Sequence, residues 1–280
     1  MRIAVSLGIV AADPEYDAVT AAQQRTWSDG DFSMVASLVI NPSENLAEAL
    51  EILPDERVLD VACGSGNGAI AAARRAWGNT VGCDFVPALL ERARERAAAE
   101  RLDIDFVAGE AQALPFEDAS FDVAMSIFGA MFAPDQQRTA DELLRVVKPG
   151  GRIGMANWVP DGGISDFFAV IAKHTGGPPP GATSPVLWGS EEHVRELFGD
   201  GIAELRTERR ANRQAFRSPD HYLDFFRAYF GPLRSAFEQV GPEGAPALEA
   251  DLREYLENLR GDARALVIEP EYLQVVAVRA

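Results

Sequence analysis

VLDVACGSGNG, residues 58–68, decides the fold of this chain. Its first five residues are largely apolar, as in a strand that is covered on both faces of a sheet. The glycines that follow lack a Cβ, so the backbone can approach a ligand closely. An Ala-rich run from Gly68 to Trp77 then predicts a helix, whose first N–H groups and positive dipole favour a negatively charged ligand group. The stretch therefore predicts a buried strand, a ligand-binding loop and a helix in direct succession.

Short apolar runs alternate with helical patterns beyond this stretch, which is typical of successive βα units. The predicted strands cover residues 58–62, 80–84, 104–108, 121–127, 152–158, 202–211 and 272–278. Helices are predicted at 68–77, 87–100, 135–147, 162–174, 191–198 and, with breaks at Gly231-Pro232 and Gly241 to Pro246, at 218–260. We expect a doubly wound α/β fold, with a mostly parallel seven-stranded sheet and helices on both faces.

Two further segments are expected around this core. Residues 1–50 would form a helical N-terminal lid, and residues 51–280 the main domain. A helical cap insertion at about 212–265 would separate the last two strands. The flanks of the core are rich in aromatic residues: Trp27, Phe32, Phe167, Phe168, Trp188, Tyr222, Phe225, Phe226, Tyr229 and Phe230. Core packing explains most of them, and the remainder fits a cap over an apolar pocket.

The composition limits the possible partners. The chain has 43 acidic and 26 basic residues and a net charge of −17, so a nucleic acid, whose phosphates such a surface repels, is not an expected partner. No run reaches the roughly 20 apolar residues of a membrane span, and no membrane association is expected.

Cys63 and Cys83 are expected to be buried free thiols in a reducing cytoplasm. Residues 1–12 are interpreted as an N-terminal extension rather than a signal peptide.

The glycine loop alone does not identify the class of cofactor. Gly64, Gly66 and Ala69 also satisfy the dinucleotide pattern G-x-G-x-x-G/A. Asp84 ends the second predicted strand and fits either class of cofactor, since both place ribose hydroxyls there. Asp60 argues against a dinucleotide, because an ionisable residue inside a buried strand is costly without a partner.

Five motifs in order carry a resemblance to a known family. They are Val58–Gly68, Asp84-Phe85, Gly109-Glu110-Ala111 with Leu114-Pro115-Phe116, Ser120–Val123, and Arg145–Arg152. In this order, over roughly residues 50–160, they resemble the class I S-adenosylmethionine (SAM)-dependent methyltransferases. The resemblance implies a Rossmann-like methyltransferase domain that binds SAM and releases S-adenosylhomocysteine (SAH).

The resemblance also implies roles for individual residues. The loop from Ala62 through Gly64 to Gly66 would meet the methionine part of SAM, with Asp60 at its base. Asp84 would accept hydrogen bonds from both ribose hydroxyls, which suits a carboxylate. Phe85 would lie against the adenine, and Glu110 and the Ala111 N–H would contact its edge; the family usually carries Asp where Glu110 stands. Ser126 would sit beneath the cofactor.

Structural roles remain open for some of these residues. Gly68 could serve helix–strand packing alone, Phe85 could belong to the core, and Ser126 could cap a turn. No catalytic residue is assigned, because methyl transfer needs an aligned nucleophile more than a general base. His174 and His221 lie in segments that could cover the substrate, but surface or core roles are favoured for them and for His193. No metal motif is present.

The predicted activity is methyl transfer from SAM to O, N or C of a small molecule, apolar or aromatic in character. Two alternatives keep the fold: a SAM-binding enzyme with non-methylating chemistry, such as a cyclase, and a SAM-binding regulatory protein. The run Arg206, Arg209, Arg210, Arg213 and Arg217 is interpreted as solubilising, with a substrate carboxylate as the alternative. A homodimer is left open.

Overall fold

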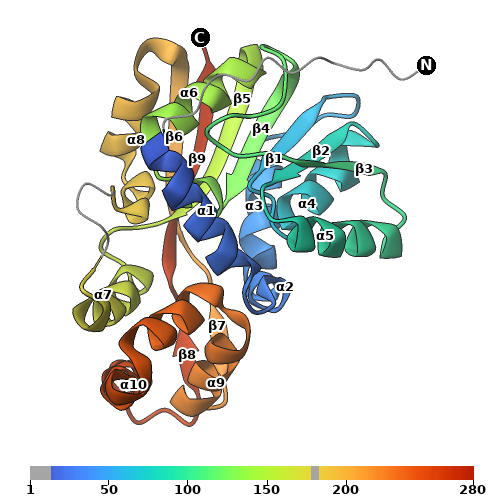
Figure 1. Cartoon of the computed structure of the whole chain (residues 1–280). Coiled ribbons are helices and arrows are strands. Elements are labelled where there is room, and N and C mark those ends of the chain that lie inside the picture. Colours follow the sequence, from blue (N-terminus) through green and yellow to red (C-terminus); the bar gives the residue numbers. More distant parts are fainter. Residues whose placement is uncertain (1–13, 178–182) are drawn as a thin grey trace.

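The computed structural model describes residues 14–177 and 183–280, and the prediction for residues 1–12 lies outside them. Seven strands form one sheet in the order β3-β2-β1-β4-β5-β9-β6, with β9 antiparallel to both of its neighbours (Figure 1). The strands are β1 (Val58–Val61), β2 (Thr80–Asp84), β3 (Ile104–Ala108), β4 (Phe121–Ile127), β5 (Val147–Trp158), β6 (Ile202–Ala211) and β9 (Glu271–Arg279). The doubly wound, mostly parallel seven-stranded sheet is thereby confirmed.

Three strands differ from the prediction at their ends, and β9 does so by one residue at each end. β1 ends at Val61 because Ala62 has a φ of 53°, which a strand residue does not adopt. β5 begins at Val147 rather than at Arg152, since Val147 pairs with Phe121 before the register shifts. The glycines of this turn thus belong to the strand and not to a separate loop.

The strand order reverses between β1 and β4. Chain direction leads from β1 outward to β2 and β3, and from β4 outward to β5 on the other side. At such a switch point the loops after the two strands diverge and leave a crevice at their carboxyl ends. The fold therefore places the glycine loop at the edge of this crevice.

Helices cover the sheet. α3 (Ile40–Ala49) contacts α4 (Asn67–Ala76) and β5, α5 (Pro87–Ala99) lies on β2 and β3, and α6 (Gln136–Val146) contacts α8 (Glu191–Phe198), β4 and β5. The alanines of α4 are almost fully buried, because small side chains let this helix approach the sheet closely. Among the described residues, no helix combines the length and the apolarity that a membrane crossing requires.

A purely helical insertion was expected at 212–265. The segment between β6 and β9 instead contains two short strands as well as two helices. It consists of β7 (Gln214–Phe216), α9 (Pro219–Tyr229), α10 (Gly231–Arg260) and β8 (Leu266–Ile268). β7 and β8 form a separate antiparallel pair that ties the two ends of the insertion together. α9 ends before Gly231-Pro232 as predicted, and Gly241, with φ 66°, interrupts α10. Figure 1 shows this group at one end of the sheet, beside α7 (Gly163–Thr175).

The N-terminal helices dock against this insertion. α1 (Pro14–Ser28) and α2 (Phe32–Ala36) precede α3, and the turn between them reaches the end of α9. Asp31 N–H donates to Tyr229 O over 3.2 Å, and Arg234 Nε donates to Asp29 Oδ2 over 2.6 Å. The Trp27 and Phe230 rings meet edge to face, with centroids 5.9 Å apart. Two segments far apart in sequence thus form one roof over the carboxyl ends of the strands.

Candidate active site

A cavity lies at the carboxyl ends of β1, β2 and β4, beneath α1 and α2. We call it the glycine-loop cavity. Its walls include the predicted residues Asp60, Ala62, Gly64, Asp84, Phe85, Glu110 and Ala111, together with Gln23, Trp27, Phe32, Asn67, Gly68 and Ile127 to Ala130. The structure therefore brings most of the predicted cofactor residues to one place, although they come from three separate segments, at the ends of β1, β2 and β3.

Gly66 and Ser126 are the predicted residues that do not line this cavity. Gly66 is the N-cap of α4, where its φ of 87° requires glycine. The Ser126 hydroxyl donates to Val61 O over 2.8 Å and accepts from Ala130 N–H over 3.0 Å. Both residues shape the loops around the cavity. The two hydrogen bonds of Ser126 correspond to the capping role that the sequence had left open. Ile127 to Ala130, which follow Ser126, line the cavity.

Asp60 is buried beneath the first turn of α4. Its Oδ2 accepts the Ala69 N–H over 2.6 Å, which satisfies one of the free donors at the start of the helix. A Cβ on Gly68 would lie 2.6 Å from the same oxygen and 2.5 Å from Ile127 Cδ1, so only glycine fits. Burial raises the pKa of Asp60 to about 8, against the opposing effect of the Ala69 hydrogen bond. Asp60 is thus a buried, hydrogen-bonded part of the cavity wall.

Asp84 connects the end of β2 with the glycine loop. Its Oδ2 accepts the Gly64 N–H and its Oδ1 the Val86 N–H, both over 2.8 Å. Burial raises the pKa of Asp84 to about 6, while these backbone hydrogen bonds oppose the rise. A carboxylate oxygen has two acceptor sites, so each retains one that can serve a ligand. The carboxylate therefore orders the loop and still lines the cavity.

Glu110 is held by its own loop. Its carboxylate accepts the Gln112 N–H and the Gln112 side-chain amide, each over 2.9 Å. Burial raises the pKa of Glu110. The backbone N–H of Asp135, at the start of α6, donates to Gln112 Oε1 over 2.6 Å. The chain after β3 is in this way fixed at the cavity wall, with Ala111 beside Glu110.

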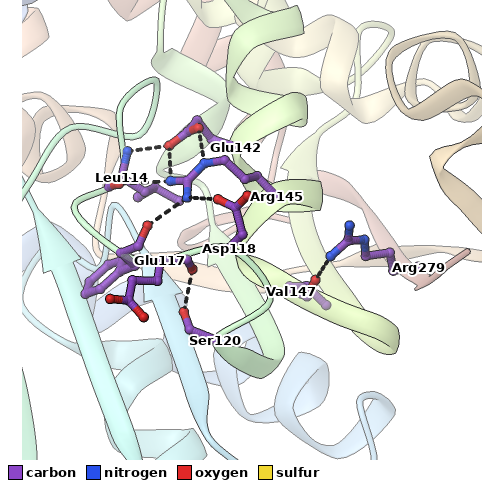
Figure 2. Close-up of polar contacts among 9 residues, drawn as sticks. Leu114, Glu117, Asp118, Ser120, Glu142, Arg145, Val147 and Arg279 are labelled. Carbon is purple, nitrogen blue, oxygen red and sulfur yellow. Dashed lines mark hydrogen bonds and ion pairs between the residues drawn. The ribbon is translucent and has the colours of Figure 1, made fainter. Parts of the chain in front are cut away.

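Arg145 of α6 secures the next part of this loop (Figure 2). Its guanidinium donates to Leu114 O, Phe116 O and Asp118 Oδ1 over 2.7–3.0 Å. The carboxylate of Glu142 accepts from Arg145 Nε and from the Leu114 N–H, each over 2.6 Å. Two of the five sequence motifs, around Leu114 and around Arg145, are therefore a single contact in space.

The N-terminal helix contributes to the site in a way that the sequence did not reveal. Gln24 Nε2 donates to Phe85 O over 2.5 Å, and Gln23 Nε2 donates to Phe132 O over 2.8 Å. Trp27, one turn further, lines the cavity. The sequence analysis noted Trp27 only as one of several aromatic residues. The spacing of residues within a helix does not predict which other part of the chain the helix packs against.

The cavity fits the nucleoside and amino acid parts of SAM. Phe85 is half-buried in its wall, beside the Asp84 carboxylate. Asn67 also lines the cavity; its Nδ2 donates to Ala36 O over 2.8 Å, while its Oδ1 is buried without a hydrogen-bond partner among the described residues. A buried acceptor of this kind calls for a donor, which the α-ammonium group of a methionine moiety would supply. Asn67 had not been predicted, and its place at the start of α4 is the signal that marks it.

A second cavity adjoins the first and is almost wholly apolar. We call it the aromatic chamber. It is lined by Trp27, Phe32, Val35, Leu38, Val39, Phe128, Phe132, Trp158, Ile164, Phe167, Phe168, Gln214, Tyr222, Phe226 and Phe230. Trp27, Phe32, Val39, Phe128 and Phe132 also line the glycine-loop cavity. The two cavities thus share a wall, and α7 and the insertion line the chamber alone.

The aromatic residues expected in the insertion divide into two groups. Tyr222, Phe226 and Phe230 line the chamber. Phe225 and Tyr229 do not, and their rings pack on each other with centroids 5.2 Å apart. This split reflects the helical period of α9, which points only one face at the chamber.

The histidines lie elsewhere and are engaged in local contacts. His174 Nε2 is 2.9 Å from Asp251 Oδ2, and His193 Nε2 is 2.7 Å from Gln136 Oε1. His221 Nδ1 accepts the Arg217 N–H over 3.3 Å. None of the three lines either cavity.

The arginine run also lies outside both cavities. Arg209 bonds Glu271 and Asp161 over 2.8–3.0 Å, and Arg210 pairs with Glu208 over 2.8 Å. This agrees with the interpretation of a solubilising surface run rather than a substrate clamp. Cys63 and Cys83 are buried free thiols as predicted, and burial raises the pKa of Cys83 to about 12.

Comparison with known proteins identifies the family of this chain. Residues 58–151 match the model of a methyltransferase domain. An uncharacterized protein of Mycobacterium tuberculosis is 38% identical over 86% of this chain and 91% of its own length. A demethylmenaquinone methyltransferase of Deinococcus radiodurans is 44% identical over 45% of this chain and 52% of its own.

The fold has a solved counterpart with product bound. The geranyl diphosphate C-methyltransferase of Streptomyces coelicolor, solved in complex with SAH, is similar with a TM-score of 0.51 at 18% identity, over 85% of this chain and 77% of that one. Motif order, sheet topology and these relatives agree. The chain belongs to the class I SAM-dependent methyltransferases.

Proposed function

We propose that this enzyme transfers the methyl group of SAM to a small, neutral, largely apolar or aromatic acceptor that binds in the aromatic chamber. The observation that carries the proposal is the shared wall between the two cavities. Trp27, Phe128 and Phe132 line both, so a ligand in the chamber would be a neighbour of a ligand in the glycine-loop cavity. Methyl transfer requires donor and acceptor to meet, and the proposal places that meeting between these three side chains.

The character of the chamber supports a neutral acceptor. Among the described residues that line it, none is charged, and aromatic rings make up most of the surface. A charged group entering this space would lose its hydration without gaining a counter-ion, which is costly. An aromatic acceptor would instead gain edge-to-face and stacking contacts, each worth about 0.5–1.5 kcal/mol beyond the area that it buries.

The chain's own residues would act by position. Bound SAM supplies an electrophilic methyl group on its sulfonium centre. Asp84, Phe85 and Asn67 would hold the cofactor, and the roof of α1 and the insertion would exclude water. No titratable His, Asp, Glu or Lys is found in the described lining of the chamber. The acceptor would therefore bring its own nucleophilic atom, and alignment would supply most of the rate.

The test is turnover with defined acceptors. The wild-type protein is incubated with SAM and one candidate acceptor at a time. The candidates are phenols, aromatic amines and alkyl-substituted hydroquinones. Mass spectrometry then quantifies both SAH and the methylated product. The expected result is SAH formed in equal amount to a methylated aromatic product. Turnover restricted to charged acceptors such as amino acids would overturn the proposal. Binding of SAM with no SAH released in any mixture would favour a regulatory or non-methylating role.

A matched pair of variants locates the acceptor. Phe226→Ala removes a ring from the chamber, and Phe225→Ala removes the neighbouring ring of α9 that does not line it. We expect Phe226→Ala to raise the acceptor KM at least about tenfold while SAH affinity stays within about twofold. Phe225→Ala should change neither by more than about twofold. Equal effects of the two variants on acceptor KM would contradict the placement.

A further inference from the structure

One polar side chain stands out in the wall of the aromatic chamber. Gln214 of β7 is 8% exposed and lines the chamber, yet its amide has no hydrogen-bond partner among the described residues. The nearby amide of Asn212, 4% exposed, differs, because its Nδ2 donates to Leu38 O over 3.0 Å. An amide that faces this apolar space without a protein partner is free to bond a ligand group that enters the chamber.

The backbone around Gln214 fixes where that amide lies. Gln214 pairs with Ile268 in the β7–β8 ladder, and Asn212 N–H donates to Pro270 O over 2.9 Å. The residue is therefore set at the base of the insertion, on a short sheet and not on a free loop. Side chains on such regular elements hold a position more precisely than side chains on loops do.

Gln214 is also outside the wall that the two cavities share. It lines the chamber but not the glycine-loop cavity, whereas Phe128 and Phe132 line both. The atom that receives the methyl group must lie near the shared wall. A group that bonds Gln214 is then a second polar group on the acceptor, separate from the reacting atom.

The chemistry of the amide limits what that second group can be. A glutamine side chain donates through Nε2 and accepts through Oε1, so it can bind a hydroxyl, a carbonyl or a neutral amide. It offers no charge to balance an ion, and the chamber lining among the described residues offers none either. The acceptor would thus be an apolar or aromatic body with two neutral polar groups.

We propose that Gln214 is a specificity-determining residue, whose side-chain amide bonds a neutral hydroxyl or carbonyl group of the acceptor away from the atom that is methylated. This inference rests on the proposed function, because it takes the chamber to be the acceptor site. Tyr222 supplies the other polar group on the insertion side, and its hydroxyl is the competing candidate.

The experiment compares two probes that differ by one hydroxyl. Binding of 1-naphthol and of 1,5-dihydroxynaphthalene is measured by calorimetry in the presence of saturating SAH, with wild-type protein, Gln214→Leu, Gln214→Met and Tyr222→Phe. The wild type should bind the diol about fivefold to tenfold more tightly, in keeping with one hydrogen bond to a buried partner. Both Gln214 variants should lose this preference and keep their affinity for 1-naphthol within about threefold. Tyr222→Phe should retain the preference.

Each other outcome counts against the inference in a distinguishable way. A preference that survives in Gln214→Leu, or that disappears only in Tyr222→Phe, overturns the assignment of Gln214 and leaves the chamber as the acceptor site. Failure of both probes to bind the SAH-loaded wild type overturns the proposed function, and the role of Gln214 with it. SAH affinity within about twofold of wild type shows that the variants are folded, and the Met variant replaces the Leu variant if only the latter fails this criterion.

Discussion

Asp84 Oδ2 accepts a hydrogen bond from Gly64 N–H over 2.8 Å and so joins the end of β2 to the glycine loop after β1. Asp84 is nearly fully buried, and its other oxygen holds the Val86 N–H. One carboxylate therefore has two tasks: it orders the loop, and it lines the cavity that would receive the ribose. Its substitution should affect both stability and cofactor affinity.

The first prediction concerns Asp84→Asn. The amide keeps the size of the side chain but turns one acceptor into a donor, so one of the two backbone N–H groups loses its partner. We expect the free energy of unfolding to fall by about 1–3 kcal/mol and SAH affinity to fall at least about tenfold. Urea denaturation and titration calorimetry measure the two quantities.

Asp122→Asn is the matched control. Asp122 is the second residue of β4, at the end of the strand opposite to the cavity, and accepts the Arg57 N–H over 2.9 Å. Its substitution should lower stability while SAH affinity stays within about twofold. If Asp84→Asn binds SAH as tightly as wild type does, the ribose does not lie at Asp84.

The second prediction is a decline of stability with rising pH. Burial raises the pKa of Asp84 to about 6 and that of Asp60 to about 8, both above their ordinary value. Between about pH 4 and pH 8 the folded protein therefore binds more protons at these groups than the unfolded chain does. Linkage then requires that their contribution to the free energy of unfolding falls as pH rises through this window, and becomes constant above it.

Asp60→Asn isolates the upper part of that window. The amide of this variant keeps an acceptor for the Ala69 N–H but does not titrate, so the decline between pH 6.5 and 8.5 should be shallower in the variant than in the wild type. Urea denaturation at several pH values supplies the comparison. Identical slopes for the two proteins would mean that Asp60 is ionised throughout.

The third prediction concerns Gly68→Ala. The new Cβ would meet Asp60 Oδ2 and Ile127 Cδ1 at 2.5–2.6 Å, so α4 or Asp60 has to shift. We expect a loss of about 1–3 kcal/mol in stability and a clear loss of SAH affinity, because the start of α4 lines the cavity. Gly78→Ala, with φ 103° and open space around its Cβ, reports the cost of backbone strain alone. An unchanged SAH affinity in Gly68→Ala would show that the cofactor does not contact this turn.

The fourth prediction concerns Arg145→Met. Removing the guanidinium frees the carbonyls of Leu114 and Phe116 and leaves Glu142 without its cation (Figure 2). We expect stability to fall by about 2 kcal/mol and SAH affinity to fall about threefold to tenfold, since the same loop carries Glu110 and Ala111. Arg279→Met, which removes a donor to Val147 O, should reduce stability without changing SAH affinity. A wild-type affinity in Arg145→Met would mean that the loop keeps its position without this contact.

The sheet and most of the glycine-loop cavity could be predicted because their signals are local. A buried strand, a glycine turn and a helix follow one another within residues 58–76, and the fold rule for parallel strands places Asp84 and Glu110 beside them. Gly66 belongs to the first motif and Ser126 follows the fourth, but neither residue lines the cavity. The sequence motifs show that these residues matter for the loops around the cofactor site. Only the packed structure shows whether these residues face the cavity or the loops.

The roof could not be predicted in the same way. α1 reaches Phe85 and Phe132 through Gln24 and Gln23, and nothing in the local pattern of a helix names a partner some 60 or 109 positions away. β7 and β8 span three residues each, which is too short for a periodic signal. The sequence therefore did not single out Gln214 within the expected helical cap, although this residue lines the aromatic chamber.

The most direct test of the account is a crystal structure of the wild-type protein with SAH. We predict that the adenine lies against Phe85, that the ribose hydroxyls bond Asp84, and that the sulfur faces the shared wall formed by Trp27, Phe128 and Phe132, so that a methyl group would point into the aromatic chamber. A sulfur that faces bulk solvent or the opposite side of the glycine loop would contradict the placement of the acceptor in that chamber.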